Sequence, residues 1–131
     1  MYLLDTNIIS DLVKNPLGQV MEGVKKVDAK NICTSVIVAG EMLFGLEDRG
    51  GGRLKKNIED VLASIPVLPI QAPADQHYGR IRAHFKRQGK PIGPNDLWIA
   101  AHALALDAVL VTANEKEFRR VPGLQIENWL R

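Results

Sequence analysis

Three acidic side chains stand in apolar stretches of the sequence, where an isolated carboxylate is costly to bury. Asp5 directly follows the apolar run Tyr2–Leu4. Glu41 is the single ionisable residue between Ser35 and Leu46. Asp96 precedes the apolar run 97–106, which contains no other charged residue. Burial of such groups is tolerated when they are neutralised, paired or bound to a cation.

Each of these acids also has an ordinary structural interpretation. Asp5 and Asp96 both stand where an aspartate commonly caps or begins a helix. Glu41 lies in a segment apolar on nearly every face, so we expect it to be substantially desolvated, and a buried salt bridge would account for it. Taken one at a time, the three acids therefore do not establish a site.

Convergence of the three acids points to a metal-dependent reaction. If Asp5, Glu41 and Asp96 face one crevice, their charges repel and raise one another's pKa, and a divalent cation relieves that repulsion. An all-oxygen ligand set favours Mg²⁺, with Mn²⁺ as a substitute. Such an ion activates water and stabilises charge on a phosphate, so the pattern indicates hydrolysis of a phosphodiester.

The elements needed to bring the acids together can be read from the hydrophobic pattern. Apolar or extended runs predict strands at 2–4, 31–34, 66–70, 108–111 and 124–126. Helical periodicity predicts helices at 8–14, 17–27, 36–47, 53–63, 74–88, 94–106 and 115–119, with Ser35 as a helix cap. Strands that alternate with helices pair in parallel, so we expect a three-layer α/β domain with a mostly parallel sheet of about five strands.

Ligands of such sheets bind beyond the carboxyl ends of the strands. Asp5 follows the first strand of this arrangement, and Thr112 and Asn114 follow the fourth. Asn114 is therefore a further candidate for the same site.

Composition narrows the class of protein. The chain has 131 residues, 46% hydrophobic and 24% charged, which suits one globular domain. Its net charge of +2 excludes a polycation but permits a local basic face. We expect a cytoplasmic protein without a membrane segment. The sequence has a single cysteine, no visible signal peptide and no apolar run long enough to span a membrane. Neither a P-loop nor a dinucleotide-binding glycine motif is present.

The motifs together resemble a PIN-domain ribonuclease of the VapC toxin group, over nearly the whole chain. The matching stretches are 3–7, Ser35–Glu41 with Gly45 and Leu46, 91–96 running into 99–102, 110–114, Glu117 with Phe118, 121–124 and 127–129. The resemblance implies that residues 1–131 form a single PIN domain. It also implies Mg²⁺-dependent endonucleolytic cleavage of RNA, often transfer RNA at the anticodon loop, and hence inhibition of translation.

The same resemblance assigns roles to residues and partners. Asp5, Glu41 and Asp96 are the acids carried over as metal ligands, and all three with Asn114 are the candidate catalytic residues. Many PIN nucleases have a fourth acid where this chain has Asn114, so we expect one tightly held Mg²⁺ unless Glu115 or Glu117 compensates. The implied partners are a VapB-type antitoxin lying across the groove and a second copy, in a homodimer within a larger complex.

Two other functions are compatible with these residues. One is a catalytically weak or inactive PIN module that binds RNA or protein, because Asn114 replaces an acid. The other is a phosphatase with an aspartyl nucleophile at Asp5, although Asn7 then stands where that chemistry needs a second acid.

Basic residues near the Asp96 helix are candidates for holding an RNA backbone. They are Arg80, Arg82, Lys86, Arg87 and Lys90, with Arg119 and Arg120 further along. For any one of them taken alone, a solvated surface charge is the favoured explanation. Trp98 could stack on a base or pack in the core, and we interpret His102 as a packed, hydrogen-bonded helix residue.

Overall fold

A five-stranded sheet forms the centre of the molecule in the computed structural model, which describes residues 1–131. The strands are β1 (Tyr2–Leu4), β2 (Ile32–Ser35), β3 (Val67–Leu68), β4 (Val109–Val111) and β5 (Ile126–Glu127). Their order is β3-β2-β1-β4-β5, and every neighbouring pair is parallel. The expected number of strands and their parallel pairing are confirmed.

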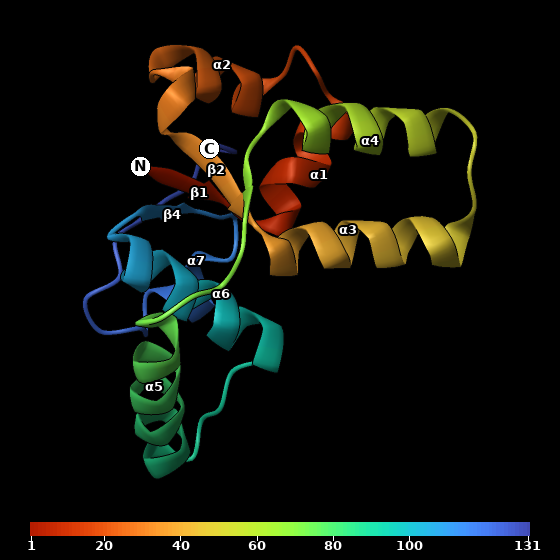
Figure 1. The fold of residues 1–131 in the computed structure, drawn as a ribbon. Coiled ribbons are helices and arrows are strands. Elements are labelled where there is room, and N and C mark those ends of the chain that lie inside the picture. Colours follow the sequence, from red (N-terminus) through yellow and green to blue (C-terminus); the bar gives the residue numbers. More distant parts are fainter.

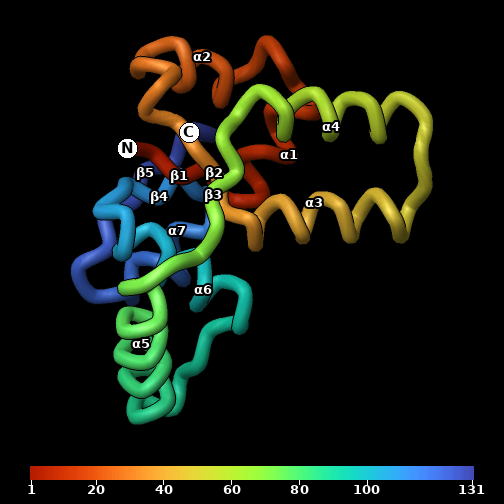
Figure 2. The backbone as a smooth tube through the Cα atoms, viewed as in Figure 1, coloured from red at the N-terminus to blue at the C-terminus, as the bar shows by residue number.

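Helices cover both faces of this sheet (Figure 1). They are α1 (Thr6–Lys14), α2 (Gln19–Lys26), α3 (Val36–Arg49), α4 (Arg53–Ser64), α5 (Ala74–Gln88), α6 (Pro94–Leu106) and α7 (Glu115–Phe118), with a 3₁₀ turn η1 (Ala29–Asn31). α3 and α4 form a hairpin that extends away from the sheet, and α5 packs beside α6 on the opposite side (Figures 1 and 2). None of the helices combines the length and apolar character that crossing a membrane requires.

Most helices begin and end within two residues of the positions that the sequence predicts. α1 begins at Thr6 rather than at residue 8, because Asp5 caps it and so recruits the two polar residues that follow. α3 runs two residues beyond the expected end to Arg49, and stops at Gly50, whose φ of 99° ordinary residues rarely adopt.

The central strands β1 and β4 lie in the middle of the hydrophobic core. Leu3, Leu4, Leu110 and Val111 are fully buried. Leu4 is in register with Val111 on one side and with Thr34 on the other, so the three strands end at the same edge of the sheet. The residues that follow them, among them Asp5, must therefore lie together at that edge.

Candidate active site

Asp5 is held by hydrogen bonds at the end of β1. Its carboxylate accepts from the backbone N–H of Thr6 through Oδ1 at 2.7 Å, and from Oγ1 of Thr112 through Oδ2 at 2.7 Å. The side chain is only 4% exposed. Burial raises the pKa of Asp5 above its ordinary value, against the opposing effect of these hydrogen bonds. Asp5 thus caps α1, as its structural interpretation predicted, and is also a partly desolvated acid.

Glu41 lies on the second turn of α3 and points toward the same edge. Its Oε1 accepts a hydrogen bond from Oγ1 of Thr6 at 2.9 Å. The buried salt bridge considered for Glu41 is absent: the ion pairs of the chain are Lys30–Asp28, Arg119–Glu115, Arg120–Glu117 and Arg131–Glu115. Sequence reasoning missed the role of Thr6, although its position beside Asp5 was the available signal.

The expectation that Glu41 is substantially desolvated was wrong. Val36, Leu43 and Phe44 are 46%, 45% and 70% exposed, and Glu41 itself is only half-buried. The physical reason is the α3–α4 hairpin, which leaves the sheet and covers α3 on one side only (Figure 1). Desolvation of Glu41 is therefore weaker than its apolar neighbours in the sequence implied.

Asp96 carries the clearest electrostatic signature of the site. It lies in the first turn of α6, and its pKa is raised to about 6. Burial is the largest cause, followed by the negative charges of Asp5, Glu41 and Glu117 in that order. Acids that follow β1 and lie on α3 and α7 therefore act on Asp96, although they are far from it in the sequence.

The region after β4 joins the same edge through its backbone. The N–H of Asn114 donates to Oγ1 of Thr112 at 3.0 Å, and the N–H of Ala113 donates to Oδ1 of Asn7 at 3.1 Å. Asn114 precedes α7 without capping it through its side chain. Asn7 thus holds the turn in which Asn114 lies, and Thr112 ties that turn to Asp5.

Glu115 and Glu117 differ in what they contact. Glu115 accepts hydrogen bonds from Asn128, Arg119 and Arg131 at 2.7–2.9 Å, and so anchors the C-terminal segment. Glu117 pairs with Arg120 at 2.9 Å, and its charge contributes to the raised pKa of Asp96. Of the two acids considered as substitutes for a fourth acid, Glu117 is the one that acts on the site.

The donor set suits a hard cation in charge and in chemistry. Carboxylate oxygens are the ligands that Mg²⁺ prefers, and the repulsion that raises the pKa of Asp96 is relieved by a bound cation. No three or more His, Cys, Asp or Glu side chains in the structure are arranged to hold one metal ion together. The acids therefore share an electrostatic environment without forming a finished ligand set.

A buried pair joins the helices that carry Glu41 and Asp96. Oγ of Ser35 caps α3 by accepting from the N–H of Ile37 at 3.1 Å, and it lies 2.9 Å from Nδ1 of His102 on α6. Both side chains are buried, at 0% and 1% exposure. Burial lowers the pKa of His102, and the backbone of Pro69 opposes that shift. The other ring nitrogen of His102, Nε2, is buried without a hydrogen-bond partner.

Comparison with known proteins identifies the family of this chain. Residues 2–124 match the PIN domain family. The chain is 38% identical over 134 residues to the Ribonuclease VapC1 of Haemophilus influenzae (strain R2866), covering 99% of this chain and 98% of that one. It is 39% identical over 129 residues to the tRNA(fMet)-specific endonuclease VapC of Shigella flexneri, covering 98% and 97%.

Solved structures show the same relationship. VapBC2 from Rickettsia felis, bound to a DNA fragment from its promoter, superposes with a TM-score of 0.90 at 34% identity, covering 98% of both chains. VapBC-1 from nontypeable Haemophilus influenzae superposes with a TM-score of 0.88 at 39% identity, covering 99% of this chain and 98% of that one. The chain therefore belongs to the PIN domain family, and within it to the VapC ribonucleases.

Proposed function

We propose that this chain is a Mg²⁺-dependent endoribonuclease, the toxin of a toxin–antitoxin pair, and that it cleaves transfer RNA in the anticodon region and so stops translation. Residues 1–131 act in this proposal as one PIN domain in the cytoplasm. The observation that carries the proposal is the raised pKa of Asp96, which is caused first by burial and then by the charges of Asp5 and Glu41. Whole-chain similarity to ribonucleases, one of them named for tRNA(fMet), supports the substrate class.

In this proposal Asp5, Glu41 and Asp96 hold the Mg²⁺, or Mn²⁺ in its place. When bound there, such an ion would lower the pKa of a water and neutralise charge on the phosphate. The chain itself supplies orientation: Thr112 and the Thr6 N–H fix the two oxygens of Asp5, and the Thr6 hydroxyl fixes one oxygen of Glu41. Asn114 contributes an uncharged oxygen, so we propose one tightly held ion before the substrate phosphate arrives.

The proposed partner is a VapB-type antitoxin, with homodimers of the chain inside a larger complex. Support comes from the solved VapBC assemblies, whose toxin chains superpose on this one along almost its full length. Copurification of the chain with the product of the neighbouring gene, followed by sedimentation, tests the partner and the stoichiometry directly.

Cleavage of purified transfer RNA by the wild type and by charge-neutral variants tests the reaction. Asp5→Asn, Glu41→Gln and Asp96→Asn should each lower the rate by at least ~10²-fold, since each removes a charge that holds the cation on which stabilisation of the transition state depends. Asp60→Asn, at an exposed acid of α4, is the matched control and should cut at the wild-type rate. EDTA should stop cleavage, and Mg²⁺ or Mn²⁺ should restore it. Full activity in Asp96→Asn would exclude this site.

A catalytically weak binding module is the second candidate, because Asn114 replaces an acid and no three acids form a ready ligand set. Calorimetric titration with Mg²⁺ separates the two. The nuclease is expected to bind one ion tightly, and Asn114→Asp is expected to strengthen binding or add a second ion. Two tight ions in the wild type would contradict the single-ion proposal, and no binding together with no cleavage would favour the module.

A further inference from the structure

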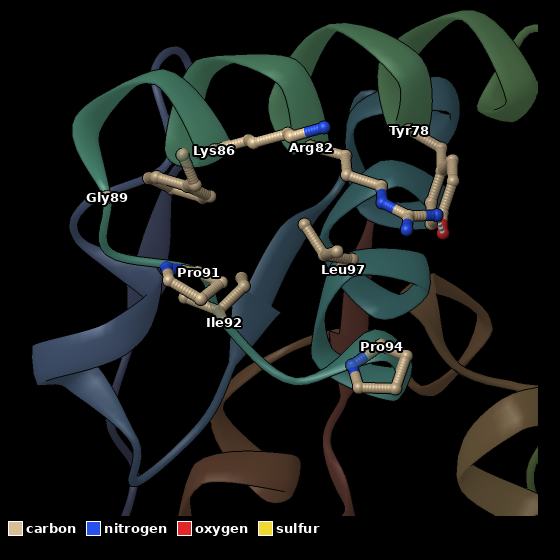
Figure 3. Close-up of a pocket in the computed structure, with 9 residues that line it drawn as sticks. Tyr78, Arg82, Lys86, Gly89, Pro91, Ile92, Pro94 and Leu97 are labelled. Atoms are coloured by element: carbon tan, nitrogen blue, oxygen red, sulfur yellow. Dashed lines mark hydrogen bonds between the residues drawn. The ribbon is translucent and has the colours of Figure 1, made fainter.

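A pocket lies against the first turn of α6, the turn that carries Asp96 (Figure 3). It has a volume of about 430 Å³ and opens between α5, the segment 89–93 and α6. Pro94 and Leu97 line it, and these two residues flank Asp96 in the sequence. Residues three apart on a helix share a face, so Asp96 projects from a different side of α6 than they do.

The rim of this pocket is basic. Arg82 and Lys86 stand one turn apart on α5, and both side chains lie over the hollow in Figure 3. Neither is in an ion pair, although several other basic residues of the chain are. The Arg82 guanidinium donates through Nη1 to the hydroxyl of Tyr78 at 3.0 Å, and Tyr78 stacks on Trp98 with ring centroids 3.9 Å apart. Arg82 is therefore oriented by an aromatic pair rather than neutralised.

The floor of the pocket is apolar and connected to the acid site. Phe85, Ile92 and Leu97 are buried and line it. Arg120 lies 4.7 Å from the centroid of the Phe85 ring and also donates to the Lys90 carbonyl. The same Arg120 pairs with Glu117, whose charge acts on Asp96. The floor is thus linked through Arg120 to Glu117, an acid whose charge acts on Asp96.

We propose that this pocket is a nucleotide subsite for the RNA substrate, adjacent to the phosphodiester that is cut. The base lies against the apolar floor, and backbone phosphates lie on Arg82 and Lys86. Charge complementarity selects this occupant: two unpaired cations at the mouth of an apolar hollow match a flat base joined to anionic phosphates. The inference rests on the proposed ribonuclease function.

α5 also carries a matched control surface. Arg80 and Arg87 lie on another face of the helix, around a smaller pocket that includes Pro122. Neither is in an ion pair, and that pocket shares no lining residue with the first. A diffuse electrostatic attraction for RNA would use both faces, whereas a subsite uses only the face with Arg82 and Lys86.

Binding of a fluorescent single-stranded oligoribonucleotide of mixed sequence, measured by anisotropy in EDTA at several salt concentrations, tests the proposal. The double variant Arg82→Gln/Lys86→Gln should reduce the slope of log K against log salt by about 1.4, since each phosphate contact on a single strand contributes ~0.7. Arg80→Gln/Arg87→Gln should leave the slope unchanged. Equal losses in both double variants would overturn the subsite.

A second pair of variants tests the hollow itself. Pro91→Glu places a carboxylate in the proposed subsite and should raise the KM for transfer RNA cleavage about tenfold with kcat retained; Pro122→Glu in the control pocket should change neither. All six substituted side chains are exposed, and thermal melts verify that each variant is folded. If RNA binding is unchanged while sedimentation shows loss of a dimer or of antitoxin binding, the pocket belongs to a protein partner and the proposal is overturned.

The outcomes also distinguish this proposal from the proposed function. A wild type that cuts no RNA, yet binds the oligonucleotide with a slope that depends on Arg82 and Lys86, would refute the nuclease and retain the nucleotide site. Cleavage that proceeds normally in every variant, with no change of slope or KM, would retain the nuclease and refute the subsite.

Discussion

The hydroxyl of Thr6 donates a hydrogen bond to Oε1 of Glu41 at 2.9 Å, although 35 residues separate them. The backbone N–H of the same Thr6 donates to Asp5. One residue at the start of α1 therefore orients two acids, one at the end of β1 and one on α3. This contact joins the start of α1 to α3 at the site.

Thr6→Val keeps the shape of this side chain and removes its hydroxyl. Hydrogen bonds to charged groups contribute ~1.5–3 kcal/mol, so loss of this one should slow RNA cleavage by about tenfold or more through misplacement of Glu41. Thr6→Ser retains the hydroxyl and should remain close to wild type. The measurement is kcat on transfer RNA, with circular dichroism as the check on folding. Equal activity in the valine and serine variants would show that the contact does not position Glu41.

The raised pKa of Asp96 predicts an unusual dependence of stability on pH. An unfolded aspartate titrates near ~3.9, whereas folded Asp96 titrates at about 6. Between these values the native chain binds a proton that the unfolded chain has lost. Stability contributed by this group is therefore highest below ~4 and falls as pH rises through about 6.

Asp96→Asn removes this titration. Its free energy of unfolding in EDTA, relative to wild type, should increase across this pH window and level off above it. Urea denaturation at a series of pH values is the measurement. Added Mg²⁺ at pH 7.5 should stabilise the wild type more than the variant, because a ligand that binds only the native state adds stability. Parallel stability curves for the two chains would contradict the assignment of the pKa to Asp96.

Substitution of Glu117 should change the pKa of Asp96, whereas substitution of Glu115 should change the packing of the C-terminal segment. Glu117→Gln removes a charge that raises the pKa of Asp96, so that pKa should fall when it is followed by carboxyl NMR titration. Glu115→Gln should leave the Asp96 titration in place and loosen the C-terminal segment held through Asn128 and Arg131. The pKa of Glu115 is lowered by these contacts, so its stabilising effect is present above ~4.3 and lost at more acid pH. Identical Asp96 titrations in both variants would refute the distinction.

Ser35→Ala removes the cap of α3 and the partner of buried His102 at once. We expect a loss of ~1–3 kcal/mol in the free energy of unfolding, from the missing cap and from the imidazole nitrogen left without a partner. Denaturant unfolding measures it, and Ser10→Ala, at a helix residue without a side-chain hydrogen bond, is the control. A loss no greater than that of the control would show that the Ser35–His102 pair is dispensable.

The element pattern was accessible from the sequence because it depends on short-range physics. The apolar run before Asp5, the prolines around β3 and the cap at Ser35 each act within a few residues. Alternation of strands and helices then restricted the sheet to parallel pairing, as observed. The burial of Glu41 was mispredicted because the sequence shows only that its neighbours are apolar. The hairpin of α3 with α4, a tertiary contact, decides which side of α3 meets solvent.

Residue types alone established that Asp5, Glu41 and Asp96 were unusual in their settings, and their motifs indicated the family before any coordinates. Sequence could not assign Thr6 to Glu41, choose Glu117 over Glu115, or show which face of α5 borders the pocket. The first two relationships depend on the register of β1 against β2 and β4, which brings the ends of distant segments to one edge. Hydrogen bonds require direct contact and the interaction between charges weakens with distance, so only the tertiary structure decided which charges and hydroxyls act together.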